Sequence, residues 1–387
     1  MSSTEPPFSV GIQEEYLLVK LDSRDVDENP PQALLEECTR RSGGQVSPRF
    51  LRSQLEASTR VCRSIAEARA ELARLRGIIA EVAGGYRCAP IAASCHPFAK
   101  ATRQITTERE QFFALANEMQ GAARRIMICG MRVHVGIDDD DLRVDLMNQL
   151  TYFVPHLLAL SCSSPFWDGE RTGLMSFRMT LLNSLPRTGL PERFASYAEL
   201  KRNLDMLVRN GVIEHAGKMW WDVRPDSLHP ALEVRVMDSC TSIEDTACLA
   251  ALIVSLARRL YRLKRDNRTW RLYPLMLIAE NRWRAMRYGI DGELLDLARG
   301  ELIGFAELTR ELIALVREDA KELGCLGEVE HLETILTRGT SAQRQIRTYE
   351  EARAAGASAR EALQAVVDFL IRETKANLAG HMVGKAS

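Results

Sequence analysis

The sequence predicts an α+β protein in which helices cover one side of an antiparallel or mixed β-sheet. Between residues 8 and 242, short segments alternate polar with apolar residues, as strands with one buried face do. From residue 243 to about 376, apolar residues recur with helical periodicity. No repeat, low-complexity segment or linker separates the two parts, so we expect a single domain over residues 1–387, strand-rich over 8–242 and helical over 243–376.

The first strand is expected at residues 8–19, where β-branched and aromatic residues have polar residues between them. Alternation places Gln13 and Glu15 on one face and Ile12 and Tyr16 on the other. Further strands are expected at 54–59, 90–98 and 130–136. Helices are expected at 32–41, 65–83, 106–125 and 140–161.

Residues 163–191 are rich in Ser, Gly and Pro and have no clear periodicity, which indicates a functional loop. After it, the segments 220–225 and 232–238 are expected to form a pair of strands. Glu233 and Arg235 share one face of the second strand. Helices are expected throughout the chain beyond Ile243.

Composition gives no reason to expect a nucleic acid or an anionic membrane as a partner, because 51 basic residues balance 52 acidic ones. The N-terminus lacks the order of a signal peptide, and no apolar run reaches the ~20 residues that span a bilayer. The nine cysteines are irregularly spaced without a CxxC pair. We therefore expect buried reduced thiols, no zinc site and a cytoplasmic location.

Four of the expected strands carry polar side chains on one face. A half-exposed sheet would explain any single strand, but four alike, beside a long loop, favour a polar cleft lined by the sheet. The side chains expected in this cleft are Gln13, Glu15, Glu56, Arg132, His134, Glu233 and Arg235.

Other familiar chemistry is not indicated, since the chain lacks the GxGxxG, GxxxxGK[ST], HExxH and GxSxG motifs. His96 either lies in the core, held by a backbone hydrogen bond, or belongs to the site. His134 is expected to line the site, because it lies between two strands that carry glutamates. The pair Trp220 and Trp221 is typical of a core or of a cleft wall.

Seven segments, in order between about residues 8 and 375, carry a resemblance to a known family. They are Gly11–Tyr16, His96–Phe98, Gly130–Gly136, Ser163–Trp167 with Arg178, Trp221–Pro225, Glu233–Arg235 with Asp238, and Glu280–Trp283 with Arg287–Gly289. Together they resemble the type-2 glutamate–cysteine ligases, also called carboxylate–amine ligases. The resemblance implies a fold related to glutamine synthetase, in which a curved antiparallel sheet forms a funnel.

The resemblance also implies a reaction and a set of site residues. ATP would phosphorylate a small-molecule carboxylate, an amine would displace the phosphate, and Mg²⁺ would screen the phosphate oxygens. Metal ligands would be Glu15, Glu56 and Glu233, and catalytic residues Arg235, Arg178 and His134. Substrate or ATP would be bound by His96, Trp221, Arg224, Arg287, Arg49 and Arg132.

This sequence departs from the family pattern at three positions expected to hold metal. Gln13 stands in place of a glutamate, Arg49 in place of an acidic residue, and Arg132 in place of a histidine. Together the changes add four units of positive charge, which approximates two Mg²⁺ ions. At ~4 Å and an effective dielectric constant of ~20, each new like-charge contact costs a few kcal/mol. We therefore expect Arg49 to lie near Glu15 or Glu56 and fewer Mg²⁺ ions than is usual, with room for one.

Lesser departures occur at Gln111–Phe112 and at Ala231. Two hypotheses follow. The chain is either a working ligase with altered metal use, or a non-catalytic member that binds a nucleotide or an acidic metabolite, or serves an intact paralogue as a partner subunit. A homodimer or a hetero-oligomer with such a paralogue fits these hypotheses, and the residues do not identify the substrate.

Overall fold

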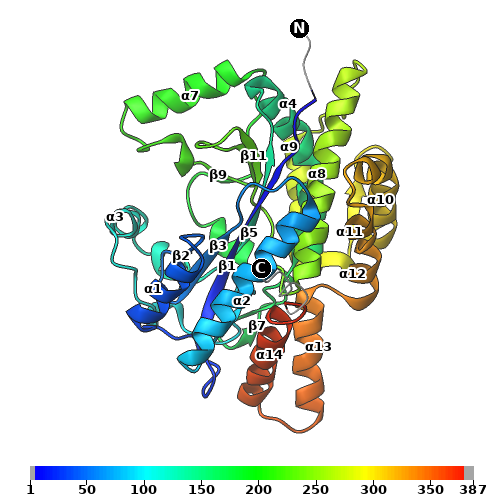
Figure 1. Ribbon diagram of the computed structural model, residues 1–387. Helices are drawn as coiled ribbons and strands as arrows, with labels where there is room; N and C mark the ends of the chain where they lie inside the picture. Colours follow the sequence, from blue (N-terminus) through cyan, green and yellow to red (C-terminus); the bar gives the residue numbers. More distant parts are fainter. Residues whose placement is uncertain (1–4, 379–387) are drawn as a thin grey trace, which may run out of the picture.

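A seven-stranded antiparallel sheet lies at the centre of the computed structural model, which describes residues 5–378 (Figure 1). Its strands follow the order β10-β11-β5-β1-β3-β2, and β4 pairs with the far end of β1. The bounds are β1 Val10–Lys20, β2 Val46–Pro48, β3 Gln54–Ser58, β4 Cys88–Ile91, β5 Met131–Gly136, β10 Val223–Pro225 and β11 Ala231–Val234. The predicted fold class is thereby confirmed.

Strand β1 changes character along its length. In its first half, burial alternates, so that Ile12 and Tyr16 are buried while Gln13 and Glu15 are partly exposed. Beyond Glu15 both faces are buried, and α14 (Ala359–Thr374) packs against this end of the sheet and β4. The polar face of the sheet therefore includes only the first half of β1, together with the strand segments that pair beside it.

Three helices cover the apolar face of the sheet: α2 (Ile65–Gly85), α4 (Asp140–Leu150) and α8 (Ile243–Arg265). Two of them begin at a side-chain cap, which satisfies a backbone N–H that has no partner within the helix. Ser64 accepts from the backbone N–H of Glu67, and Asp139 accepts from that of Leu142. These helices and the inward side chains of β1, β5 and β11 form one hydrophobic core.

Several predicted elements are shorter than expected. The strand expected at 90–98 ends at Ile91, and the helix expected at 106–125 is α3 (Glu110–Met119), which ends where Gln120 adopts a φ of 48°. The helix expected at 140–161 is divided by a 3₁₀ turn into α4 and α5 (Val154–Ser161). Pro155 at the start of α5 lacks the N–H that would continue the earlier helix.

The remaining elements of the first part are short or lie at its periphery. They are α1 Gln32–Arg41, β6 Phe166–Trp167, β7 Glu170–Arg171, α6 Arg178–Leu182, β8 Thr188–Gly189, α7 Tyr197–Arg209 and β9 Trp220–Trp221, with 3₁₀ turns at Ala101–Arg103, Ala123–Arg125, Thr151–Phe153 and Ala216–Lys218. The expected loop at 163–191 thus contains the hairpin β6–β7, the short helix α6 and the strand β8.

The chain beyond α8 is helical except for one hairpin, so the prediction of helices throughout is wrong there. Strands β12 (Glu293–Asp296) and β13 (Glu301–Gly304) pair around a turn. In this turn Asp296 accepts two backbone hydrogen bonds and Gly300 adopts a φ of 76°. The helices are α9 Leu275–Tyr288, α10 Phe305–Glu322, α11 Leu326–Glu330, α12 Leu332–Arg338, α13 Ser341–Ala354 and α14, with a 3₁₀ turn at Gly289–Asp291.

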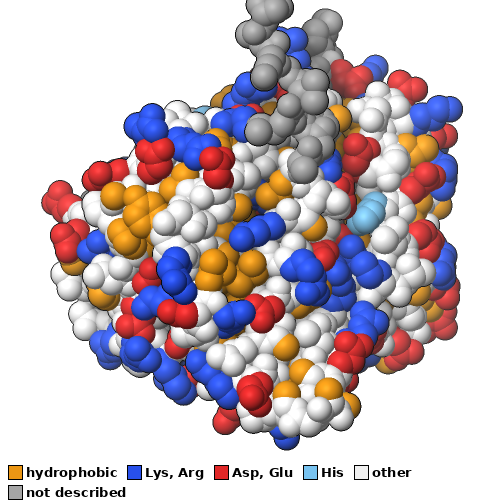
Figure 2. Space-filling view, turned by 60° about the horizontal axis from the view of Figure 1, so that its bottom comes forward, with side chains coloured by type: hydrophobic (Ala, Val, Ile, Leu, Met, Phe, Trp, Pro, Cys, Tyr) orange, Lys and Arg blue, Asp and Glu red, His pale blue; other side chains and the backbone are white. Residues whose placement is uncertain are grey.

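No helix within residues 5–378 is both long enough and apolar enough to cross a lipid bilayer. The face of the molecule drawn in Figure 2 carries basic and acidic side chains interspersed.

A fully buried ion pair joins β1 to α2 on the helix-covered side of the sheet. Glu14 and Arg76 each have a side chain without solvent exposure, and two hydrogen bonds of 2.7 and 2.9 Å connect them. Arg76 also donates to the backbone carbonyls of Cys240 and Thr241, and Thr246 donates to Glu14. This pair therefore ties the central strand to the connection that leads from the sheet into α8.

Replacement of Arg76 by alanine should lower the free energy of unfolding by ~3–5 kcal/mol, because it leaves the Glu14 carboxylate buried without a counter-charge. Urea denaturation measures the effect. The matched control is Arg40→Ala, which removes a solvent-exposed ion pair with Glu37 and should leave the free energy of unfolding nearly unchanged. Equal losses in the two variants would contradict a structural role for the buried pair.

Candidate active site

The register of the sheet brings the predicted polar side chains onto one face. Across the β1–β3 pair, Glu15 lies opposite Glu56. Across the β1–β5 pair, Gln13 lies opposite Arg132, and His134 of β5 lies opposite Glu233 of β11. Because these strands are neighbours in the sheet, the side chains form one continuous polar surface.

Two arginines bridge the carboxylates of Glu15 and Glu56. Arg49 Nη2 lies 3.0 Å from Glu15 Oε1, and Arg49 Nη1 lies 3.4 Å from Glu56 Oε2. Arg132 contacts Glu15 and places Nη1 3.0 Å from Glu56 Oε2, while Gln13 accepts a hydrogen bond of 2.8 Å from Arg132. The prediction that Arg49 lies beside these glutamates is confirmed.

A second pair of arginines holds Glu233. Arg224 Nε donates to one carboxylate oxygen at 2.6 Å, and Arg235 Nη1 donates to the other at 2.7 Å. Burial alone would raise the pKa of Glu233, but Arg235 and Arg224 outweigh it and lower the pKa to about 2. Glu233 is therefore a permanent anion at neutral pH.

The same opposition of burial and charge acts on the other members of the cluster. Burial acts to raise the pKa of Glu15, but Arg132, Arg49 and Arg178 bring the pKa below its usual value. The pKa of Arg132 is raised, since Glu56 and Glu15 outweigh its burial. Burial lowers the pKa of Arg235 to about 10, although Glu233 opposes this shift. Glu15, Arg132 and Arg235 are therefore charged at neutral pH, as Glu233 is.

His134 is held in place by an aspartate that sequence reasoning missed. Its Nδ1 lies 2.9 Å from a carboxylate oxygen of Asp226, a residue just after β10. Its Nε2 is buried and forms no hydrogen bond within residues 5–378. Asp226 therefore fixes the orientation of the ring on the polar face, and leaves the second ring nitrogen without a partner from this part of the chain.

Arg178 is positioned by the segment that follows β11. Its guanidinium donates to the carbonyl of Val236 at 3.1 Å and lies 3.7 Å from Asp238. Asp238 is fully buried and accepts hydrogen bonds from three serine groups, Ser163 N, Ser164 Oγ and Ser176 Oγ. Gly130 is required here, because a Cβ at that position would lie 2.4 Å from the Arg178 guanidinium.

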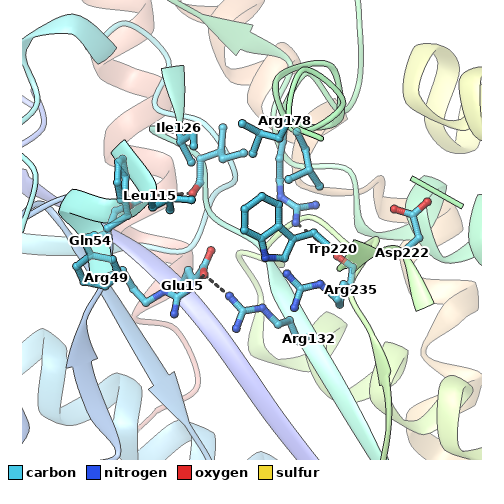
Figure 3. A pocket seen from close by; sticks show the side chains of 15 residues that line it. Glu15, Arg49, Gln54, Leu115, Ile126, Arg132, Arg178, Trp220, Asp222 and Arg235 are labelled. Carbon is cyan, nitrogen blue, oxygen red and sulfur yellow. Dashed lines mark hydrogen bonds and ion pairs between the residues drawn. The ribbon is translucent and has the colours of Figure 1, made fainter. Parts of the chain in front are cut away.

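A cavity of about 170 Å³ opens beside this cluster. Its charged side chains include Glu15, Arg49, Arg132, Arg178 and Arg235. Its apolar wall includes Phe50, Phe112, Leu115, Ile126, Leu185 and Trp220. Figure 3 shows the Trp220 indole between Arg178 and Arg235. A second cavity, of about 250 Å³, is lined by residues that include Gln13 and His134.

Four residues expected to bind substrate or ATP do not line the first cavity. His96 is fully buried, where its ring bonds the backbone of Arg24, Phe98 and Ala99, and burial lowers its pKa to about 4. This placement agrees with the core alternative that the sequence left open. Trp221 packs on Phe194, and it is Trp220 that faces the cavity.

The other two of the four interact elsewhere. Arg287 donates to the carbonyl of Gly173 at the surface. Arg224 donates to Glu233 and to the backbone carbonyls of Gly217 and Met219, and it does not line the first cavity. Conversely, the apolar wall was missed. Phe112 was noted only as a departure from the family pattern, and the sequences around Leu115 and Leu185 carry no signal of a site.

The carboxylates of the cluster do not fit a site for two or three metal ions as they stand. Within residues 5–378, no group of three or more His, Cys, Asp or Glu side chains converges in a way that could hold a metal. Glu15, Glu56 and Glu233 each contact two arginines instead. A bound divalent cation would have to displace or lie beside these guanidinium groups, which repel it.

Comparison with known proteins identifies the family. The model for glutamate–cysteine ligase family 2 matches residues 9–368. A protein of Rhodospirillum rubrum named "Putative glutamate--cysteine ligase 2" is 52% identical over 97% of this chain and 97% of its own, and one of the same name from Jannaschia sp. is 47% identical over 96% and 98%. The chain therefore belongs to the glutamate–cysteine ligase family 2, and it is a ligase by class.

Solved structures confirm the fold at low sequence identity. A glutamate–cysteine ligase from Francisella tularensis in complex with AMP superimposes with a TM-score of 0.66 at 15% identity, over 96% of this chain and 90% of that one. A bifunctional glutathione synthetase from Pasteurella multocida gives 0.68 at 15%, over 94% of this chain but only 52% of that one.

Removal of the bridging arginines should destabilise the fold unequally. Arg49→Ala should cost about 1–2 kcal/mol, since Arg49 is one-third exposed and Arg132 still contacts both glutamates. Arg132→Ala should cost ~3–5 kcal/mol, because its charge lies deeper among the carboxylates. Urea denaturation with Arg202→Ala, an exposed change on α7, as control measures both losses. A larger loss for Arg49→Ala would contradict the central place of Arg132.

Glu233 should make stability depend on pH in acid. Its pKa of about 2 in the fold lies below the ordinary 4.5. Its contribution is thus complete above pH 4.5 and is lost as the pH falls toward 2. Between about pH 5 and about pH 3, the free energy of unfolding of Glu233→Gln should fall less steeply than that of wild type. Glu170→Gln, an exposed change in β7, should retain the wild-type slope, and an unchanged slope in Glu233→Gln would refute this assignment.

Proposed function

We propose that this protein is an ATP-dependent carboxylate–amine ligase that forms an amide through an acyl phosphate, with a metal site in which arginine supplies part of the positive charge. The observation that carries the proposal is the bridging of Glu15 and Glu56 by Arg49 and Arg132 at the edge of a cavity. Family membership supports the reaction class, and glutamate and cysteine appear in the name of the relatives.

The proposed reaction has two steps. A carboxylate oxygen of the substrate attacks the γ-phosphorus of ATP, so that a C–O–P anhydride forms and ADP leaves. An amine nitrogen then attacks the acyl carbon, the C–N bond forms, the C–O bond to phosphate breaks, and the nitrogen loses a proton. Both steps move negative charge onto phosphate oxygens, which preorganised guanidinium groups stabilise.

We assign roles to the arginines and the histidine from their positions. Arg178 and Arg235 face the first cavity and would orient the substrate carboxylate. Arg132 lines the first cavity and is hydrogen-bonded to Gln13, which lines the second, so Arg132 would meet the transferred phosphoryl group. His134, whose Nε2 has no partner from the described chain, would contact the nucleotide side. In this proposal the carboxylate would bind in the first cavity and the nucleotide in the second.

Mg²⁺ would accompany ATP in smaller number than the family pattern implies. Its function would be to screen the phosphate oxygens, most of its ligands being phosphate and water. Glu56 is the protein group that best fits it, because Glu56 Oε2 contacts arginines but is buried without hydrogen-bond geometry to any described donor. Glu15 and Glu233 are more completely occupied by arginine.

The arginine-filled site also supports a second candidate. A family member whose carboxylates are neutralised internally would bind a nucleotide or an acidic metabolite without turnover, or act in a hetero-oligomer with an intact paralogue. The observation that favours it is that no group of three or more His, Cys, Asp or Glu side chains within residues 5–378 could hold a metal ion.

Phosphate release from ATP separates the two candidates. Wild-type protein should release phosphate when Mg²⁺, a carboxylate and an amine are all present. The triple variant Gln13→Glu, Arg49→Glu, Arg132→His should be slower by about tenfold or more if the arginines stabilise the transferred phosphoryl group. The assay should cover a panel of amino acids at several Mg²⁺ concentrations.

A silent wild type with an active triple variant would favour the non-catalytic candidate, because the variant restores three ligand types that Mg²⁺ accepts. If both proteins are folded and both silent, the ligase proposal fails and the departures at Gln111 and Ala231 gain weight. Far-ultraviolet circular dichroism and urea denaturation of both proteins control for folding.

A further inference from the structure

The first cavity combines a cationic floor with an apolar wall, and this combination is specific about what can fill it. The guanidinium groups of Arg178 and Arg235 line one part of the cavity, and Phe112 and Leu115 of α3 line another. Figure 3 shows the Trp220 indole beside the two arginines. A ligand that fills the cavity must therefore be anionic at one end and hydrocarbon at the other.

The floor has hydrogen-bond donors available for an anion. Arg235 donates through Nη1 to Glu233, and its remaining side-chain N–H groups form no hydrogen bond within residues 5–378. Arg178 donates to backbone carbonyls and lies only 9% exposed at the edge of the cavity. A carboxylate that contacts these two groups gains charge-assisted hydrogen bonds from side chains that are themselves largely buried.

Within residues 5–378, the cavity offers no acidic group that is free to pair with an ammonium ion. Glu15 lines it but is held by Arg132 and Arg49. Asp222 also lines it, yet Arg282 donates to both of its oxygens, at 2.7 and 3.3 Å. An α-amino acid would thus bring its ammonium group among arginines or against hydrocarbon, and either placement is costly.

The volume of the cavity and its aromatic wall limit the size and the kind of apolar group that a ligand can carry. Its volume of about 170 Å³ is close to that of an engineered apolar cavity of ~150 Å³ that takes one benzene molecule. Phe50 and Phe112 meet edge to face with ring centroids 6.1 Å apart, which leaves aromatic surface on the same wall for a ligand ring. One aromatic ring or a branched aliphatic group of similar size fits these dimensions.

We propose that the carboxylate substrate is a small apolar acid without an α-ammonium group, with its carboxylate on Arg178 and Arg235 and its hydrocarbon body on Phe112, Leu115 and Trp220. This inference rests on the proposed ligase function, because it assumes that the cavity holds the acid to be activated. It assigns the acid a chemistry unlike that of glutamate, whose second carboxylate and ammonium group the apolar wall would have to bury.

Direct binding tests this inference without requiring turnover. Isothermal titration calorimetry should compare benzoate and 3-methylbutanoate with glutamate and phenylalanine, with and without Mg²⁺ and a non-hydrolysable ATP analogue. Both apolar acids should bind at least tenfold more tightly than either amino acid. Tighter binding of glutamate or phenylalanine, or no binding of the apolar acids under either condition, would overturn the inference.

Variants locate the bound acid. Leu115→Asp should weaken benzoate binding tenfold or more, because the new carboxylate repels the ligand and removes apolar contact, and Leu115→Gln should weaken it less. Phe113→Asp on the same helix is the matched control, since Phe113 is 48% exposed and does not line the cavity. Benzoate affinity that is unchanged in Leu115→Asp would overturn the placement.

Phosphate release with the same acids and a panel of amines separates this inference from the ligase proposal. If apolar acids bind as expected but no amine elicits phosphate release, the binding class stands and the ligase proposal fails. If phosphate is released with glutamate and not with apolar acids, the ligase proposal stands and this inference fails.

Discussion

Two adjacent glutamates on the central strand set the constraint on which the rest of the structure depends. Because side chains of a strand alternate, Glu14 points toward the helices and Glu15 toward the cavity. Each carboxylate is withdrawn from water and each is neutralised by arginine, Glu14 by Arg76 and Glu15 by Arg132 with Arg49. The strand therefore carries balanced charge on both faces, and the ion pairs attach it to its surroundings in two directions.

The polar face of the sheet was predictable because it depends only on local alternation and strand order. The period of two in β1, β3, β5 and β11 separated polar from apolar side chains, and antiparallel pairing brought Glu15, Glu56 and Glu233 to the same surface. The nearness of Arg49 followed from charge, since a guanidinium at a position expected to be acidic needs carboxylates around it. Predictions of this kind require no knowledge of how distant segments pack.

The cavity wall was not predictable, since it is assembled from segments far apart in the chain. Phe112 and Leu115 come from a short helix, Leu185 follows α6, and Trp220 begins a two-residue strand. Nothing in these segments distinguishes a residue of the cavity wall from an ordinary core residue. The two tryptophans are an example, since Trp221 was expected at the site but Trp220 lines the cavity. His96 illustrates the opposite error, because its ring supports a turn in the core and contacts no part of the cavity.

The arginines of the site belong to the chain, and this has a consequence for how the site responds to its surroundings. A dissociable cation occupies its site only as far as its free concentration permits, and leaves when chelators or nucleotides compete for it. Arg49 and Arg132, which lie beside Glu15 and Glu56, are covalent parts of the chain and cannot dissociate from it. The positive charge that these arginines supply is therefore present as soon as the chain is synthesised and does not depend on the concentration of metal ions in the cell.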